Sequence, residues 1–213
     1  MIRRAGFSDS SATEVATLSL RFGSVRVRAR LYWPRATPAP SISVLFAGTR
    51  ETAGADHLSH GLCVVARTVV LRLPADSSLD RELAALEWAA EHAAELGADP
   101  HRLIVGGHLE GGARAARLAV ESASRGWPRV ARQVAVHPAF AAGQPLPGGI
   151  DSAPAATVVT TGDRTDGGMR YAIRLRSSGV EVDELRHPHD VLLADDHARG
   201  AMLADLARSL GGR

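Results

Sequence analysis

The sequence predicts an α/β fold with a mostly parallel central sheet and helices on both faces. Short apolar runs typical of buried strands alternate along the chain with longer segments whose apolar residues recur at helical spacing. One such run, over 103–105, enters a turn with glycines on both sides and is followed by an alanine-rich helical segment over 113–123. In a parallel sheet of this kind, the functional side chains lie at the carboxyl ends of the strands.

Length and composition indicate one domain. The 213 residues, 45% of them hydrophobic, are enough for one well-buried core and short for two. We therefore expect a single domain over 16–213. Residues 1–15 are rich in Ser, Ala and Thr without any period, and we expect them to form a flexible arm.

The first half of the chain carries clear strand and helix patterns. Over 16–33 apolar residues alternate with arginines, which predicts a half-exposed antiparallel strand. The apolar runs over 41–46 and 68–73 predict buried strands. Helical spacing covers 57–66 and 79–96, and a glycine ends the second segment.

The second half continues the alternation and ends in a helix. Strands are expected over 133–136, 156–161 and 180–185, and helices over 169–178 and 193–210. The arginines that follow the glycine-flanked turn are expected on a solvated helix face, without the interleaved aromatic residues that nucleic-acid binding favours. They are Arg114, Arg117, Arg125, Arg129 and Arg132.

The glycine-flanked turn has the form of a nucleophile elbow without its nucleophile. Gly107 and Gly111 remove Cβ atoms where backbones crowd, so the residue between them stands exposed at the end of the strand. In the motif G-x-S-x-G that residue is the serine that attacks a carbonyl carbon. Here it is Leu109, which has no nucleophilic atom.

From residue 41 onward the chain resembles the α/β-hydrolases of the hormone-sensitive-lipase-like esterase group. Most of the resemblance lies in 83–112, where Trp88, the Gly97-Ala98-Asp99-Pro100 turn and the Gly107–Gly112 elbow follow the family's order. The resemblance implies an α/β-hydrolase fold. The insertions that form a lid in many relatives are missing, so we expect a minimal or absent lid.

The resemblance also implies the positions of two triad partners and of an oxyanion loop. Asp163, after the next-to-last strand, matches the family's acid, and His189, after the last strand, matches its histidine. The loop that is normally His-Gly-Gly-Gly reads Ala47-Gly48-Thr49-Arg50, so fewer backbone N–H groups can face a developing oxyanion.

The candidate catalytic residues are therefore His189, Asp163, Glu110 and His108. Asp163 would fix the tautomer of His189 and make it a general base near neutral pH. His108 and Glu110 flank the apex, where two ionisable groups need partners or a role. The candidate substrate contacts are Leu109, Gly48, Thr49 and Arg50.

Three functions follow from these residues. The first is a non-hydrolytic enzyme that performs acid/base chemistry, such as isomerisation, cyclisation, elimination or decarboxylation, on a small metabolite. The second is a catalytically inactive pseudo-hydrolase that binds a ligand or a protein partner. The third is a residual esterase whose nucleophile is displaced to Cys63, Ser59 or Thr49.

Composition sets the expected surroundings. The formal charge of +2 is too small to indicate nucleic acid, and no apolar stretch reaches the roughly 18 residues of a membrane span. The single cysteine fits a reducing, cytoplasmic compartment. All basic residues are arginine, which suggests a bacterium with a GC-rich genome and a role in specialised metabolism. We expect a small-molecule substrate or ligand, no metal and no cofactor, and keep a protein partner or homodimer as alternatives.

Overall fold

The computed structural model describes most of the chain. The described residues are 5–10, 13–22, 25–35, 40–48, 53–75, 78–140, 147–161, 167–187, 192 and 196–211.

The described strands form one nine-stranded sheet in the order β1-β2-β3-β5-β4-β6-β7-β8-β9. The strands are β1 Ala5–Ser10, β2 Thr13–Phe22, β3 Val25–Pro34, β4 Ile42–Phe46, β5 Val69–Leu73, β6 Leu103–His108, β7 Arg132–Val136, β8 Ala155–Thr160 and β9 Val182–Arg186. Neighbouring strands from β5 to β9 are parallel, and β1, β2 and β3 add an antiparallel edge. The predicted mostly parallel sheet is confirmed.

The amino-terminal part differs from the sequence expectation in two respects. The single strand expected over 16–33 is a hairpin, in which Phe22 of β2 pairs with Val25 of β3. The alternating pattern has the same period on both arms, so it does not mark the break. Residues 5–10 and 13–15, expected within a flexible arm, lie in β1 and β2. Among the described strands β1 pairs with β2 alone, and an edge strand held by backbone hydrogen bonds needs no apolar period.

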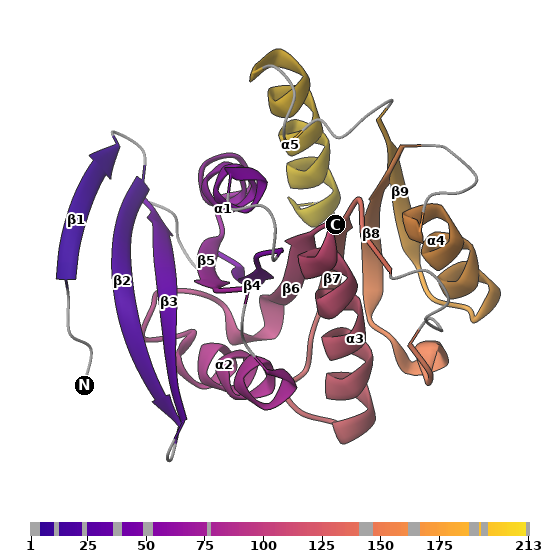
Figure 1. Cartoon of the computed structure of the whole chain (residues 1–213), viewed down its shortest axis with the longest axis horizontal. Coiled ribbons are helices and arrows are strands. Elements are labelled where there is room, and N and C mark those ends of the chain that lie inside the picture. The colour runs from indigo at the N-terminus through magenta and orange to yellow at the C-terminus, as the bar shows by residue number, and fades with distance from the viewer. Residues whose placement is uncertain are drawn as a thin grey trace.

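Five described α-helices cover the two faces of the sheet (Figure 1). They are α1 Ala53–Val65, α2 Leu79–His92, α3 Glu110–Arg125, α4 Gly167–Ser177 and α5 Asp196–Gly211, with short 3₁₀ turns at Pro100–Arg102 and Ile150–Ser152. Alternate strand residues face opposite layers: Leu45 and Ile104 pack with α1 and α5, whereas Val44 and Val105 pack with α2 and α3. Within the described ranges, no helix is both long and apolar enough to cross a bilayer.

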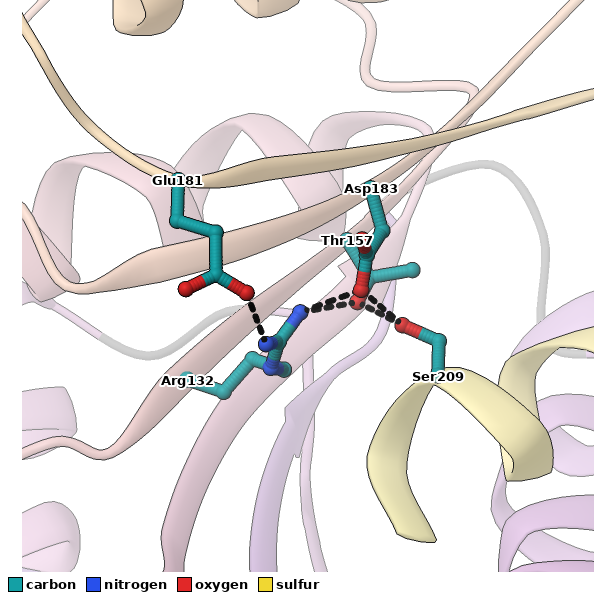
Figure 2. A network of polar contacts seen from close by, with 5 residues as sticks. All are labelled: Arg132, Thr157, Glu181, Asp183 and Ser209. Atoms are coloured by element: carbon teal, nitrogen blue, oxygen red, sulfur yellow. Dashed lines mark hydrogen bonds and ion pairs between the residues drawn. The ribbon is translucent and has the colours of Figure 1, made fainter. Parts of the chain in front are cut away.

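A polar network connects the carboxyl-terminal end of α5 to the first residues of β7, β8 and β9 (Figure 2). Arg132, the first residue of β7, donates through Nη1 to Asp183 at 2.8 Å and Thr157 at 3.2 Å, and its Nη2 lies 3.3 Å from Glu181. Ser209 of α5 donates to the same Asp183 oxygen at 2.9 Å and lies 2.6 Å from the Thr157 hydroxyl. One guanidinium therefore joins β7, β8 and β9, and Ser209 connects α5 to its partners.

The Arg132→Met substitution should lower the free energy of unfolding by about 1–2 kcal/mol. The Arg132 side chain is 17% exposed, and its loss removes the donor shared by the buried Thr157 hydroxyl and by the Asp183 and Glu181 carboxylates, which are 43% and 63% exposed. Urea denaturation measures the change. Arg125→Met is the matched control, because it breaks an exposed i,i+4 pair with Glu121 worth less than about 0.5 kcal/mol. Equal effects of the two substitutions would contradict the role given to the network.

Candidate functional site

The turn between β6 and α3 has the strained backbone of an elbow. Leu109 has φ 50° and ψ −120°, a region that leucine rarely adopts and that costs about 1–3 kcal/mol. Its amide donates to the carbonyl of Val136 at 3.0 Å, and its carbonyl accepts from the amides of Ala113 at 3.1 Å and Ala139 at 3.0 Å. The Leu109 side chain is partly exposed. The fold thus holds Leu109 at the apex, at the carboxyl end of a central strand.

Two glycines let the elbow touch the neighbouring strand backbone to backbone. A Cβ atom on Gly111 would overlap the carbonyl oxygen of Phe46, the last residue of β4. A Cβ atom on Gly107 would overlap the backbone of Gly111 and lie 2.8 Å from the same Phe46 oxygen. The elbow is therefore pressed against the point where Ala47 and Gly48 leave β4.

The carboxylate of Glu110 lies against Gly48. Its Oε2 atom is 2.6 Å from the position that a Cβ atom on Gly48 would occupy. That oxygen is buried and makes no hydrogen bond within the described part of the chain. Glu110 begins α3, where the helix dipole favours a negative charge. In hydrolases with this elbow, the oxyanion hole combines the amide after the nucleophile with an amide of the neighbouring loop. Glu110 is the residue after the apex, and its carboxylate lies beside Gly48 of the neighbouring loop.

Arg114, in the first turns of α3, holds the segments that follow β4 and β5. Its Nε donates to Glu82 at 2.6 Å, and its Nη1 donates to the carbonyls of Ala75 at 2.7 Å and Ala47 at 3.3 Å. The guanidinium carbon lies 5.5 Å from the centroid of the Phe46 ring. One side chain therefore ties the segments after β4 and β5 to α2 and α3.

The solvated face expected for the arginines is wrong for Arg114 and Arg132. Arg114 is 18% exposed, Arg132 is 17% exposed, and both make ion pairs with carboxylates. The i,i+4 spacing from Glu110 is the sequence signal that could have placed Arg114 near the site. Its partner Glu82 was missed, because a glutamate in the first turn of an amphipathic helix is ordinarily exposed.

His108 lies beneath the elbow instead of facing solvent. It is 2% exposed, and its ring centroid is 6.3 Å from that of His137 in an edge-to-face arrangement. His137, at the end of β7, is itself 6% exposed and has a φ of 44°. The catalytic role expected for His108 stays a prediction. The burial of His108 favours a role in supporting the elbow.

The remaining predicted site residues fall outside the described part of the chain. They are Thr49, Arg50, Asp163 and His189. The structure brings together Gly48, Leu109 and Glu110, with His108 below them. β8 and β9 are parallel to β6, so they end, at Thr160 and Arg186, at the same edge of the sheet as the elbow. In the sequence, Asp163 and His189 follow these two strand ends.

The side chains considered as displaced nucleophiles are buried where they are described. Cys63 is 0% exposed among apolar residues of α1, and burial raises the pKa of its thiol to about 12, so it is not a thiolate at neutral pH. Ser59, also 0% exposed, donates to the carbonyl of Ala55 at 2.7 Å. Within the described residues, no group of three or more His, Cys, Asp or Glu side chains could hold a metal ion.

The Gly111→Ala substitution should destabilise the protein by about 3 kcal/mol or more, because the added methyl group must push β4 away from α3. Urea denaturation tests this. Gly200→Ala in α5 is the control: nothing lies within 4 Å of its added atom, and alanine should stabilise the helix by up to about 1 kcal/mol. A Gly111→Ala protein as stable as the parent would refute the backbone contact.

Comparison with known proteins agrees with this geometry. A family model described as alpha/beta hydrolase fold matches residues 57–150. Carboxylesterase NlhH of Mycobacterium tuberculosis is 29% identical over 146 residues, a match that covers 62% of this chain and 46% of that enzyme. The matched segment thus spans less than half the length of this curated relative.

Solved esterase structures superimpose on nearly the whole chain. A thermostable esterase from Pseudomonas putida gives a TM-score of 0.80 at 20% identity and covers 95% of this chain and 84% of its own. A hyperthermophilic esterase from the archaeon Pyrobaculum calidifontis gives 0.75 at 20% identity and covers 92% and 84%. With the sheet order and the strained elbow, these similarities establish that the chain has the α/β-hydrolase fold.

Proposed function

We propose that this protein is a non-hydrolytic enzyme on the α/β-hydrolase fold that transfers protons on a small metabolite. The observation that carries the proposal is the Glu110 carboxylate against Gly48, directly beside an apex whose leucine cannot attack a carbonyl. In this proposal Leu109 gives the site an apolar surface where a hydrolase has its nucleophile, and Glu110 gives it a proton acceptor beside the position of the oxyanion hole.

Two features of the apex support this proposal over ester hydrolysis: Leu109 stands where a nucleophile would, and the Glu110 carboxylate lies beside Gly48. Removing the nucleophile from a serine triad costs on the order of a million-fold in kcat. Removing one oxyanion-hole donor costs roughly a hundred- to a thousand-fold, and a carboxylate in the same place also repels the developing negative charge. Ester hydrolysis at this apex would have to overcome both penalties.

Proton transfer suits the residues that remain. Glu110 is a partly exposed residue whose Oε2 makes no hydrogen bond to the described residues, and in this proposal its carboxylate accepts a proton from a C–H or N–H acid. In this proposal His189, oriented by Asp163, donates or accepts the second proton of the reaction. Leu109 and Gly48 contact its apolar part, and Thr49 and Arg50 contact its polar part. Isomerisation, cyclisation, elimination and decarboxylation all fit this arrangement.

The cellular setting is part of the same proposal. We place the reaction in the cytoplasm of a bacterium, in specialised metabolism, where a hydrolase fold is given a new chemistry. The relatives are named as carboxylesterases and esterases. Their names favour a carbonyl or ester compound as the substrate class.

A ligand-binding pseudo-hydrolase is the second candidate. The observation that favours it is the partly exposed Leu109 at the apex, an apolar surface that can contact a ligand or a protein partner without reacting. Binding without turnover distinguishes this candidate from the first.

The enzyme should catalyse exchange of solvent deuterium into its substrate. Incubation of the protein with a bacterial metabolite extract in D₂O, followed by mass spectrometry, identifies the substrate as the compound that gains deuterium. Glu110→Gln and His189→Ala should each slow the labelling at least about a hundred-fold. Glu121→Gln, which changes a partly exposed glutamate of the same helix, is the matched control. Labelling that persists in Glu110→Gln would refute the assigned role, and binding without labelling would favour the second candidate.

Restoring the nucleophile should reveal what Glu110 does to the oxyanion site. Leu109→Ser should hydrolyse p-nitrophenyl acetate weakly, and the double variant Leu109→Ser/Glu110→Ala should be about a hundred-fold faster or more, because the repelling carboxylate is gone. Leu109→Ala/Glu110→Ala is the control. Parent activity that survives Leu109→Gly but falls in Cys63→Ala or Ser59→Ala would instead revive the residual esterase.

A further inference from the structure

A cavity of about 850 Å³ opens at the opposite end of the sheet from the elbow. Its lining includes His101 just before β6, Ala131 just before β7 and Ala155 at the start of β8. These are the amino ends of the three strands, whereas Leu109 follows the carboxyl end of β6. The length of β6 separates the cavity from the elbow by roughly 17 Å. The two sites are therefore distinct.

An exposed tryptophan forms part of the cavity wall. α3 ends at Arg125, and Gly126, with a left-handed φ of 73°, turns the chain toward β7. Trp127 follows this turn and is 51% exposed. The remaining lining is mostly apolar, with prolines and alanines on the surrounding turns. A concave site of 300–1,000 Å³ with apolar walls and few polar groups is typical of small-molecule binding.

The charged side chain of the lining is a cation, Arg129. Arg129 and His101 line the cavity, and no carboxylate of the described residues does. The neighbouring Asp99 accepts a hydrogen bond from the His101 amide at 2.8 Å and is not part of the lining. The hydroxyls of Ser122 and Ser152 both donate to backbone carbonyls. The side chains available to a ligand are thus an exposed guanidinium, an imidazole and an indole.

We propose that this cavity binds a small carboxylate with an aromatic body. The guanidinium of Arg129 offers paired donors that match both oxygens of a carboxylate. The exposed indole of Trp127 offers a face or an edge to an aromatic ring. A cation would face Arg129 without any carboxylate of the lining to offset it, and a purely apolar ligand would leave the guanidinium unused. The charge of the lining therefore selects the anion.

Three probes of the same shape test this site: 3-phenylpropanoate, 3-phenylpropanamide and 3-phenylpropylammonium. Binding is followed by the indole N–H signals in ¹H–¹⁵N correlation spectra, and Trp127→Phe identifies the Trp127 signal. The carboxylate should shift that signal saturably and bind at least about tenfold more tightly than the amide. The ammonium compound should neither shift the signal nor displace the carboxylate.

Two variants assign the charge preference. Arg129→Gln should weaken carboxylate binding about tenfold and leave amide binding unchanged. Arg174→Gln, an exposed arginine of α4 away from the cavity, should change neither. Equal affinity for all three probes, the absence of any saturable shift, or carboxylate binding unaffected by Arg129→Gln would each overturn the proposal.

Discussion

The contact between the elbow and the end of β4 is the constraint on which the candidate site depends. Gly107 and Gly111 pack directly on the Phe46 carbonyl, so closely that neither position has room for a Cβ atom. This contact fixes how α3 leaves the sheet, and it holds the strained backbone of Leu109 whatever side chain stands there. The elbow geometry is therefore a property of the fold, and the chemistry depends on the side chains that the fold presents.

The same contact explains why Glu110 is unusual. The residue after the apex begins α3, and from there the Glu110 side chain reaches Gly48. A small residue would leave the space beside Gly48 open, whereas the Glu110 carboxylate occupies it. Arg114 donates to the carbonyls of Ala47 and Ala75 in the neighbouring segments and to the carboxylate of Glu82. These hydrogen bonds of Arg114 therefore stabilise the frame of the site.

The fold could be predicted because its signals are local. The β6 run, the paired glycines and the helix after them each have a distinct pattern, and the structure confirms the parallel sheet. The sequence pattern could not show that β2 and β3 are two strands, because apolar and polar residues alternate with the same period in both. Ion pairs such as Arg114 with Glu82, 32 residues apart in sequence, and the burial of His108 arise only from tertiary packing. The roles of Asp163 and His189 stay predictions, since both lie outside the described residues.

The energetics of Glu110 connect its position to the kind of substrate that we propose. A carboxylate oxygen removed from water is unfavourable unless a donor or a cation compensates it, and the described residues supply no hydrogen bond to Oε2. A carbonyl or ester compound without an acidic hydrogen brings only acceptor oxygens to this place and would add to the penalty. A substrate that offers a proton, from nitrogen, oxygen or an acidic carbon, would relieve it on binding. The favourable substrate is thus one with a hydrogen to give, and that hydrogen is what an acid/base enzyme transfers.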